Sequence, residues 1–199
     1  MKGPIMRKIY ATLLIQTGVL ALCSAPLHAA IQFGFNGDAQ LSSNSVLFGQ
    51  YPNGAPYTPS PGYGTEEISA VNEGIFSNSG LTTGEFGTIE SLALQPGPVT
   101  LPGPFMTFDS GASNLQLWVT SIRAGNHGAL SGIDTPNGAV ISFAVEGYIL
   151  DSNNSTTKQA FFCTFSMTVS GQTVGEVLNS TTNTPFTATV SLTAPPLNL

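Results

Sequence analysis

Short runs in which apolar and polar residues alternate recur along most of this chain. The segments 31–36 and 115–119 show the pattern clearly, and similar runs follow after residue 133. A period of two places the apolar side chains on one face of a β-strand. The pattern therefore predicts strands, with Trp118 on the face opposite Leu115, Leu117 and Val119.

The region from Ile133 to Leu192 predicts strands at 139–150, 159–169 and 186–192. The residues Asp134-Thr135-Pro136-Asn137-Gly138 predict a turn before the first of them. Gly147 interrupts the alternation and predicts a β-bulge, after which Tyr148 is expected on the face of Ile141 and Val145. Residues 173–178 predict one short helical turn. Strands about 10 to 15 residues apart with turn residues between them predict an antiparallel β-sandwich or jelly roll.

The first 29 residues have the three parts of an export signal. Lys2, Arg7 and Lys8 form a positive start, residues 9–22 are mostly apolar, and residues 25–29 end in small side chains. The apolar part is shorter and more interrupted than a membrane span, which needs about 20 residues. We expect a signal peptide at 1–29 that is cleaved, a single domain at 30–194 and a short tail at 195–199. The expected location is secreted or extracellular, with the periplasm or cell surface as alternatives.

Two rival interpretations of this segment are a lipidated Cys23 and an uncleaved anchor. Leu22 stands where a lipoprotein signal needs a small residue, which disfavours the first. The short apolar stretch disfavours the second.

Cleavage would leave two basic residues, Arg123 and Lys158, against 11 acidic ones, and therefore a formal charge of −9. So acidic a protein repels phosphate groups, which argues against nucleic acid and against an anionic membrane as partners. Cys163 would be the only cysteine, which rules out a disulfide within one mature chain.

Few side chains offer familiar catalytic chemistry. His127 lies between glycine-containing turns and would be the only histidine, and the chain has no G-x-S-x-G motif. Cys163 lies in an apolar run and is expected to be a small buried side chain. We therefore expect a protein that is not an enzyme and needs no cofactor.

Carboxylates are the one reactive group present in number. Five of them gather in one stretch: Glu66, Glu67, Glu73, Glu85 and Glu90. Two could act as acid and base of a glycoside hydrolase, but the spacing selects no pair. The favoured interpretation is acidic loops that keep the domain soluble.

A weak calcium loop is the other use for acidic residues. Asp151, Asn153 and Ser155 offer oxygen ligands at alternate positions. Thr156 and Phe162 stand where such a loop has its glycine and its closing glutamate, so the match is incomplete.

An aromatic loop is expected between residues 51 and 64, YPNGAPYTPSPGYG. Its prolines exclude a central strand. Tyr51, Tyr57 and Tyr63 are six residues apart and could stack on sugar rings or on a partner surface. The plainer interpretation is an insertion tolerated at the edge of a sandwich. If the protein binds a carbohydrate or an extracellular protein, these tyrosines are the first candidate contacts and Trp118 is the second.

Five segments together resemble a known class of exported protein: 134–138, 140–147, 161–169, 171–174 and 186–192. They are similar to the C-terminal half of small exported bacterial proteins of the PEP-CTERM class. The resemblance implies a signal peptide, a β-sandwich body and an extracellular or surface location. The end of the chain, Ala-Pro-Pro-Leu-Asn-Leu, departs from that class, whose members continue with Pro-Glu-Pro, an apolar span and a basic cluster.

These observations favour a secreted, non-enzymatic binding protein or a component of an extracellular matrix or surface. One alternative is a glycan-active enzyme that uses two of the glutamates. Another is a structural subunit that assembles through an edge strand at 31–35.

Overall fold

The computed structural model describes residues 32–50, 60–72, 80–108, 114–151 and 158–192. Within these ranges it contains β-strands and one short helix. They are β1 (Gln32–Ser42), β2 (Ser45–Phe48), β3 (Tyr63–Val71), β4 (Phe86–Glu90), β5 (Leu92–Ala93), β6 (Gly97–Pro98), β7 (Met106–Phe108), β8 (Leu115–Ile122), β9 (Leu130–Thr135), β10 (Gly138–Asp151), β11 (Gln159–Ser170), α2 (Val174–Leu178) and β12 (Thr184–Leu192).

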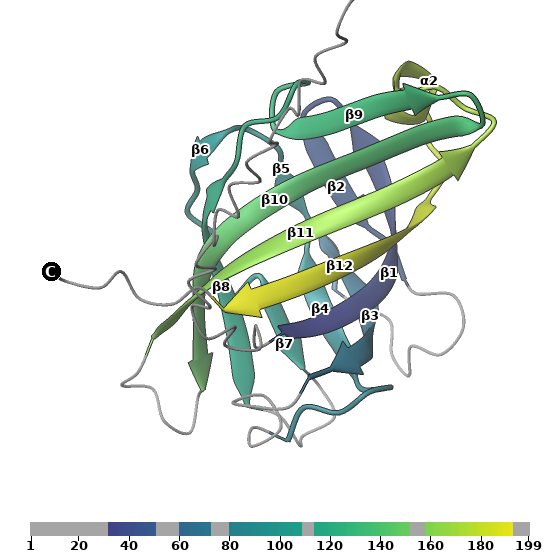
Figure 1. Ribbon diagram of the computed structural model, residues 1–199. Helices are drawn as coiled ribbons and strands as arrows, with labels where there is room; N and C mark the ends of the chain where they lie inside the picture. The colour runs from purple at the N-terminus through teal and green to yellow at the C-terminus, as the bar shows by residue number, and fades with distance from the viewer. Residues whose placement is uncertain (1–31, 51–59, 73–79, 109–113, 152–157, 193–199) are drawn as a thin grey trace, which may run out of the picture.

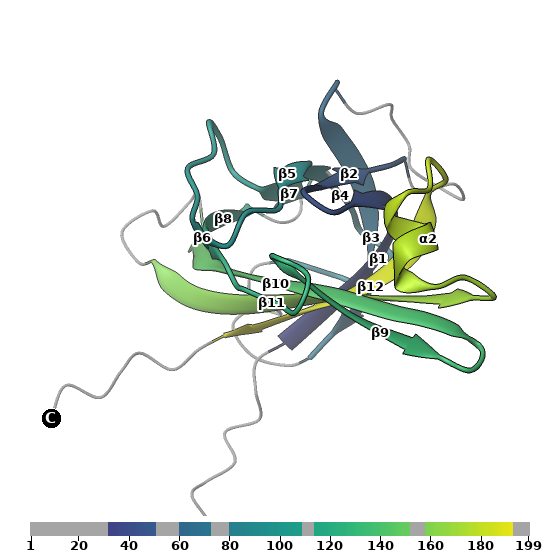
Figure 2. The ribbon, with the colours of Figure 1, turned by 90° about the horizontal axis from the view of Figure 1, so that it is seen from above.

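The strands form one antiparallel sheet that closes into a barrel of eight positions (Figures 1 and 2). The order around the barrel is β1, β3, β4, β7, β8, β10, β11 and β12, and β12 pairs with β1 to close it. The antiparallel all-β prediction is confirmed, whereas two separate packed sheets are not what the chain forms. The alternation of apolar and polar residues indicates only that each strand has one buried face. Strands of a sandwich and strands of a barrel both have one buried face, so the pattern does not distinguish the two folds.

Phenylalanine rings fill the centre of the barrel. Phe165 is fully buried and lies in ring contact with five others: Phe35, Phe48, Phe105, Phe143 and Phe186. The ring of Phe143 stacks on that of Phe165 with a centroid separation of 4.3 Å. Burial of these large rings, together with many aliphatic side chains, stabilises a chain whose described part contains no disulfide.

One barrel position is shared by two strands. On the edge of β1 that faces away from β12, Phe33 to Gly37 pair with β3, and Ala39 to Ser42 pair with β2. On the far side, β4 pairs with β3 and the adjoining β5 pairs with β2. Strands β2 and β3 are therefore two halves of one strand, the first ending at Phe48 and the second beginning at Tyr63.

The first strand is paired on both sides. Gln32 to Ala39 bond to β12, while Phe33 to Gly37 bond to β3. The sequence-based hypothesis of an edge strand at 31–35 is thus wrong for the described residues 32–35, because closure of the barrel removes that edge.

The turn at 134–138 joins β9 to β10, with Thr135 opposite Gly138. The sequence pattern did not reveal β9, whose alternation is brief. The expected short helix is present as α2, capped by Thr173 and Glu176. It lies beside the tip of this hairpin (Figure 1). The methyl groups of Val174 fill the space that a side chain at Gly132 would need, and the Val174 N–H donates to the carboxylate of Asp134.

Candidate functional site

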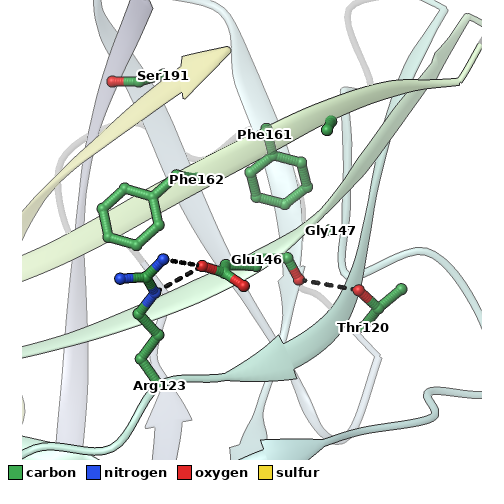
Figure 3. Close-up of a pocket in the computed structure, with 8 residues that line it drawn as sticks. Thr120, Arg123, Glu146, Gly147, Phe161, Phe162 and Ser191 are labelled. Carbon is green, nitrogen blue, oxygen red and sulfur yellow. Dashed lines mark hydrogen bonds and ion pairs between the residues drawn. The ribbon is translucent and has the colours of Figure 1, made fainter. Parts of the chain in front are cut away.

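A hollow of about 610 Å³ lies on the outer wall of the barrel, across β8, β10, β11 and β12 (Figure 3). Its sides and floor come from residues on four strands: Thr120, Arg123, Glu146, Gly147, Ala160, Phe161, Phe162 and Ser191. Side chains that alternate outward along neighbouring strands meet here because Glu146 is directly opposite Phe162, and Phe162 is directly opposite Ser191.

Arg123, Glu146 and Phe162 form a compact group on one side of the hollow. The guanidinium of Arg123 donates to the carboxylate of Glu146 through Nε, at 2.5 Å, and through a terminal nitrogen. Its central carbon lies 4.9 Å from the centroid of the Phe162 ring. The side chains of Arg123 and Glu146 are 61% and 38% exposed, so the pair adds little to stability but presents oriented donors and acceptors to solvent.

A second aromatic group adjoins the first along the same strands. The rings of Trp118 and Tyr148 lie nearly parallel, 8° apart, with centroids separated by 6.2 Å. The Nζ of Lys158 lies 4.2 Å from the centroid of the Tyr148 ring. The Nε1 of Trp118 has no hydrogen-bond partner in the described part of the chain. Trp118 thus takes the outer face, as expected, and is half-buried there by its neighbour Tyr148.

A β-bulge sets the spacing of these two groups. The register between β8 and β10 shifts between Glu146 and Gly147, and Thr120 is the extra residue. A side chain at Gly147 would collide with the carbonyl oxygen of Trp118, so only glycine fits. A bulge is present at Gly147, as expected, but the expected change of phase in the strand of Gly147 and the expected inward position of Tyr148 are wrong. The extra residue lies in β8, so β10 keeps its phase and Tyr148 points outward with Glu146.

The other candidate ligand contacts are only partly described. Tyr51 and Tyr57 lie outside the described residues, and Tyr63 is the first residue of β3, opposite Glu90. Of the calcium candidates, Asp151 ends β10, whereas Asn153 and Ser155 lie outside the described residues. The described residues contain no group of three or more potential metal-binding side chains.

The glutamates expected in acidic loops do not all lie in solvated loops. Glu66 is fully buried and Glu85 is 4% exposed, which corrects the expectation that both lie in solvated loops. Glu66 points inward because it shares the face of Ile68, and Glu85 accepts the N–H of Thr82. Glu67 and Glu90 lie in strands β3 and β4, and Glu73 lies outside the described residues.

The outward pair, Glu67 and Glu90, is spread along the sheet. Glu67 is opposite Phe86, and Glu90 is four residues further along β4. The backbone positions of the two glutamates are therefore offset by about 13 Å along the strand direction. Burial of the Glu90 carboxylate raises its pKa, and its Oε2 accepts no hydrogen bond from the described residues.

His127 and Cys163 occupy the structural positions that the sequence indicates. His127 is exposed in a tight turn, where its backbone pairs with Leu130. Cys163 is fully buried, and that burial raises the pKa of its thiol well above the usual value. No helix among the described residues is long and apolar enough to cross a membrane.

The group around Arg123 was not found by sequence reasoning, which treated Arg123 and Lys158 only as charges. One signal was available. In the strands 139–150 and 159–169 the alternation leaves Glu146 and Phe162 outward, so both are available to contact each other if the two strands pair.

The chain was compared with models of protein families, with curated proteins and with solved structures. None of the three comparisons finds a match.

Proposed function

We propose that this protein is a non-enzymatic extracellular binding protein that holds a carbohydrate on its outer wall. The observation that supports this proposal is the pairing of cations with rings. Arg123 and Lys158, the two basic residues of the described part, each lie over an aromatic side chain, and both lie beside the same part of the sheet.

Sugars present two kinds of surface, and this region matches both. Their C–H faces pack against aromatic rings such as Trp118 and Phe162, which are rigid and partly exposed. Their hydroxyl groups need donors and acceptors with fixed directions, and the Arg123–Glu146 pair provides both on one side of the hollow. A shallow open hollow suits a chain of sugars better than it suits a small molecule that must be enclosed.

The positions of the glutamates also favour binding over hydrolysis. Glu66 and Glu85 are closed to solvent, and the backbone positions of Glu67 and Glu90 are offset by four residues along the sheet, so the strand register does not bring two exposed glutamates of this stretch side by side.

The proposal can be tested by measuring glycan binding of the purified protein on an array, and then with two variants. Trp118→Ala and Phe162→Ala should each weaken binding at least about tenfold, since each removes a ring face worth roughly 1.4 kcal/mol or more. Ile133→Ala, which shortens an exposed apolar side chain on β9, is the matched control and should leave affinity unchanged. Unchanged binding by both aromatic variants would overturn the proposal.

A further inference from the structure

A second hollow lies beside the hollow around Phe162. It has a volume of about 120 Å³, lies over β12, β1 and β3, and is lined by Gln32, Phe33, Gly34, Ala70, Asn72 and Thr189. Ser191 of the first hollow is directly opposite Gln32 of the second, so the two are adjacent across the strands. The two adjacent hollows are here called the transverse trough.

Small residues keep the floor of the transverse trough low. Gly147 and Ala160 lie in its first part, and Gly34 and Ala70 face each other across β1 and β3 in its second part. From β8 to β1 the trough crosses four strand spacings, or about 19 Å. This length accommodates an extended chain of several sugar units.

The second part of the trough is polar and uncharged. It offers the hydroxyl groups of Thr189 and Ser191 and the amides of Gln32 and Asn72. Within the described part of the chain, none of these four side chains makes a hydrogen bond to the protein. Their hydroxyl and amide groups are donors and acceptors of the kind that pair with hydroxyl groups of a ligand.

Charge restricts the class of ligand further. Arg123 and Glu146 are the charged side chains that line the two hollows, and they are paired with each other. The whole chain carries a formal net charge of −6, which repels anionic polymers. The ligand that suits such a surface is neutral.

We infer that the transverse trough binds an extended neutral glycan that crosses β8, β10, β11, β12 and β1. This inference rests on the proposed function and specifies its ligand class. Phe162 packs against a sugar ring in the first part of the trough, with Trp118 on the adjoining stretch of β8. The amides and hydroxyl groups from Ser191 to Asn72 pair with sugar hydroxyls in the second part.

The test uses the purified full chain, titrated calorimetrically with cello- and chito-oligosaccharides from the disaccharide to the hexasaccharide. Polygalacturonate serves as the anionic comparison. Affinity for at least one neutral series should rise with chain length until the trough is filled. It should change little between roughly 0.01 M and 1 M salt, because screening acts on charged partners.

Three variants separate the two parts of the trough. Thr189→Val and Asn72→Ala should each weaken binding of the hexasaccharide roughly fivefold, the effect of one lost hydrogen bond, and leave the disaccharide unaffected. Phe162→Ala should weaken both. Thr187→Val is the matched control, since Thr187 is also exposed on β12 but lines a different hollow.

Each alternative outcome overturns a distinct statement. One outcome is that affinity does not depend on the length of the oligosaccharide and that only Phe162→Ala, not Thr189→Val or Asn72→Ala, weakens binding. In that case the extended-chain inference is wrong and the proposed function stands. Preference for polygalacturonate, or no binding to either neutral series, overturns the neutral class. If Phe162→Ala and Trp118→Ala both bind normally, the proposed function itself fails.

Discussion

The carboxylate of Glu66 occupies the space that a side chain at Gly87 would need. The two residues are directly opposite each other on β3 and β4, and both face the interior of the barrel. On its other side Glu66 is opposite Gly37, so glycines flank it on both neighbouring strands. The barrel thus accommodates an inward glutamate by omitting the side chain at Gly87, whereas the space beside Gly37 is filled by the ring of Phe186.

This relationship predicts a large cost for the smallest substitution at Gly87. A Cβ there would collide with the Glu66 carboxylate and with the carbonyl oxygen of Thr107, and a backbone carbonyl cannot turn aside. We expect Gly87→Ala to lower the free energy of unfolding by about 1 to 3 kcal/mol, measured by urea denaturation. Gly175→Ala in α2, which would meet no atom, should instead raise it by up to about 1 kcal/mol. Equal effects at the two positions would contradict the packing argument.

Phe165 should dominate the stability of the core. Truncation to alanine removes a fully buried ring that contacts five other phenylalanines, and should cost about 3 to 5 kcal/mol. Phe162 lies half-exposed on the outward face of the same strand, and its truncation to alanine should lower the free energy of unfolding by less than about 1 kcal/mol. Denaturant midpoints of the two variants measure the difference. A comparable loss at Phe162 would mean that the outer wall is packed against something else.

Asn126 should protect the open edge of β9. Its side chain accepts the N–H of Gly132 at 2.8 Å and donates to the carbonyl of Gly132 at 2.9 Å, so it takes the place of a neighbouring strand. Asn126→Ala should lower stability by about 1 to 2 kcal/mol and expose an edge that can pair with a second molecule. Light scattering at rising protein concentration would detect that association. Asn183→Ala, at an exposed position before β12, serves as the comparison.

Glu176 should make α2 sensitive to acid. Its carboxylate accepts the backbone N–H of Thr173 and then the Thr173 hydroxyl, which together lower the pKa of Glu176 below its usual value near 4.5. A lowered pKa in the folded state contributes stability above pH 4.5 that is lost as the pH falls through the lowered value. NMR titration of the carboxyl carbon measures the pKa directly. Glu176→Gln should reduce the pH dependence of unfolding in that window, and an unchanged dependence would contradict the assignment.

Local patterns predicted individual elements better than their assembly. The strands at 139–150 and 159–169, the turn before Gly138 and the short helix follow from alternation, from turn residues and from a capping box, all of which act over a few residues. Closure of the sheet depends on the pairing of β12 with β1, about 150 residues apart in sequence, and no local signal encodes it.

The site illustrates the same limit. Trp118 was expected to point outward because its neighbours alternate inward, and it does. Its stacking on Tyr148 could not be foreseen, because it depends on which strand carries the extra residue of the bulge. The inward position of Glu66 is equally hidden, since it depends on the identity of the residue opposite, Gly87, whose missing side chain makes room for the carboxylate.

The divided strand formed by β2 and β3 makes this barrel a suitable scaffold for presenting an inserted peptide or domain. Both halves are fixed by their own hydrogen bonds to β1 and to β4 or β5, so the register of the wall does not depend on the length of chain between Gly49 and Tyr63. Lengthening such a connection costs little, about 0.6 kcal/mol for each doubling. A foreign peptide or a small domain could be grafted there, or new chain termini opened there by circular permutation, with the barrel intact beneath it.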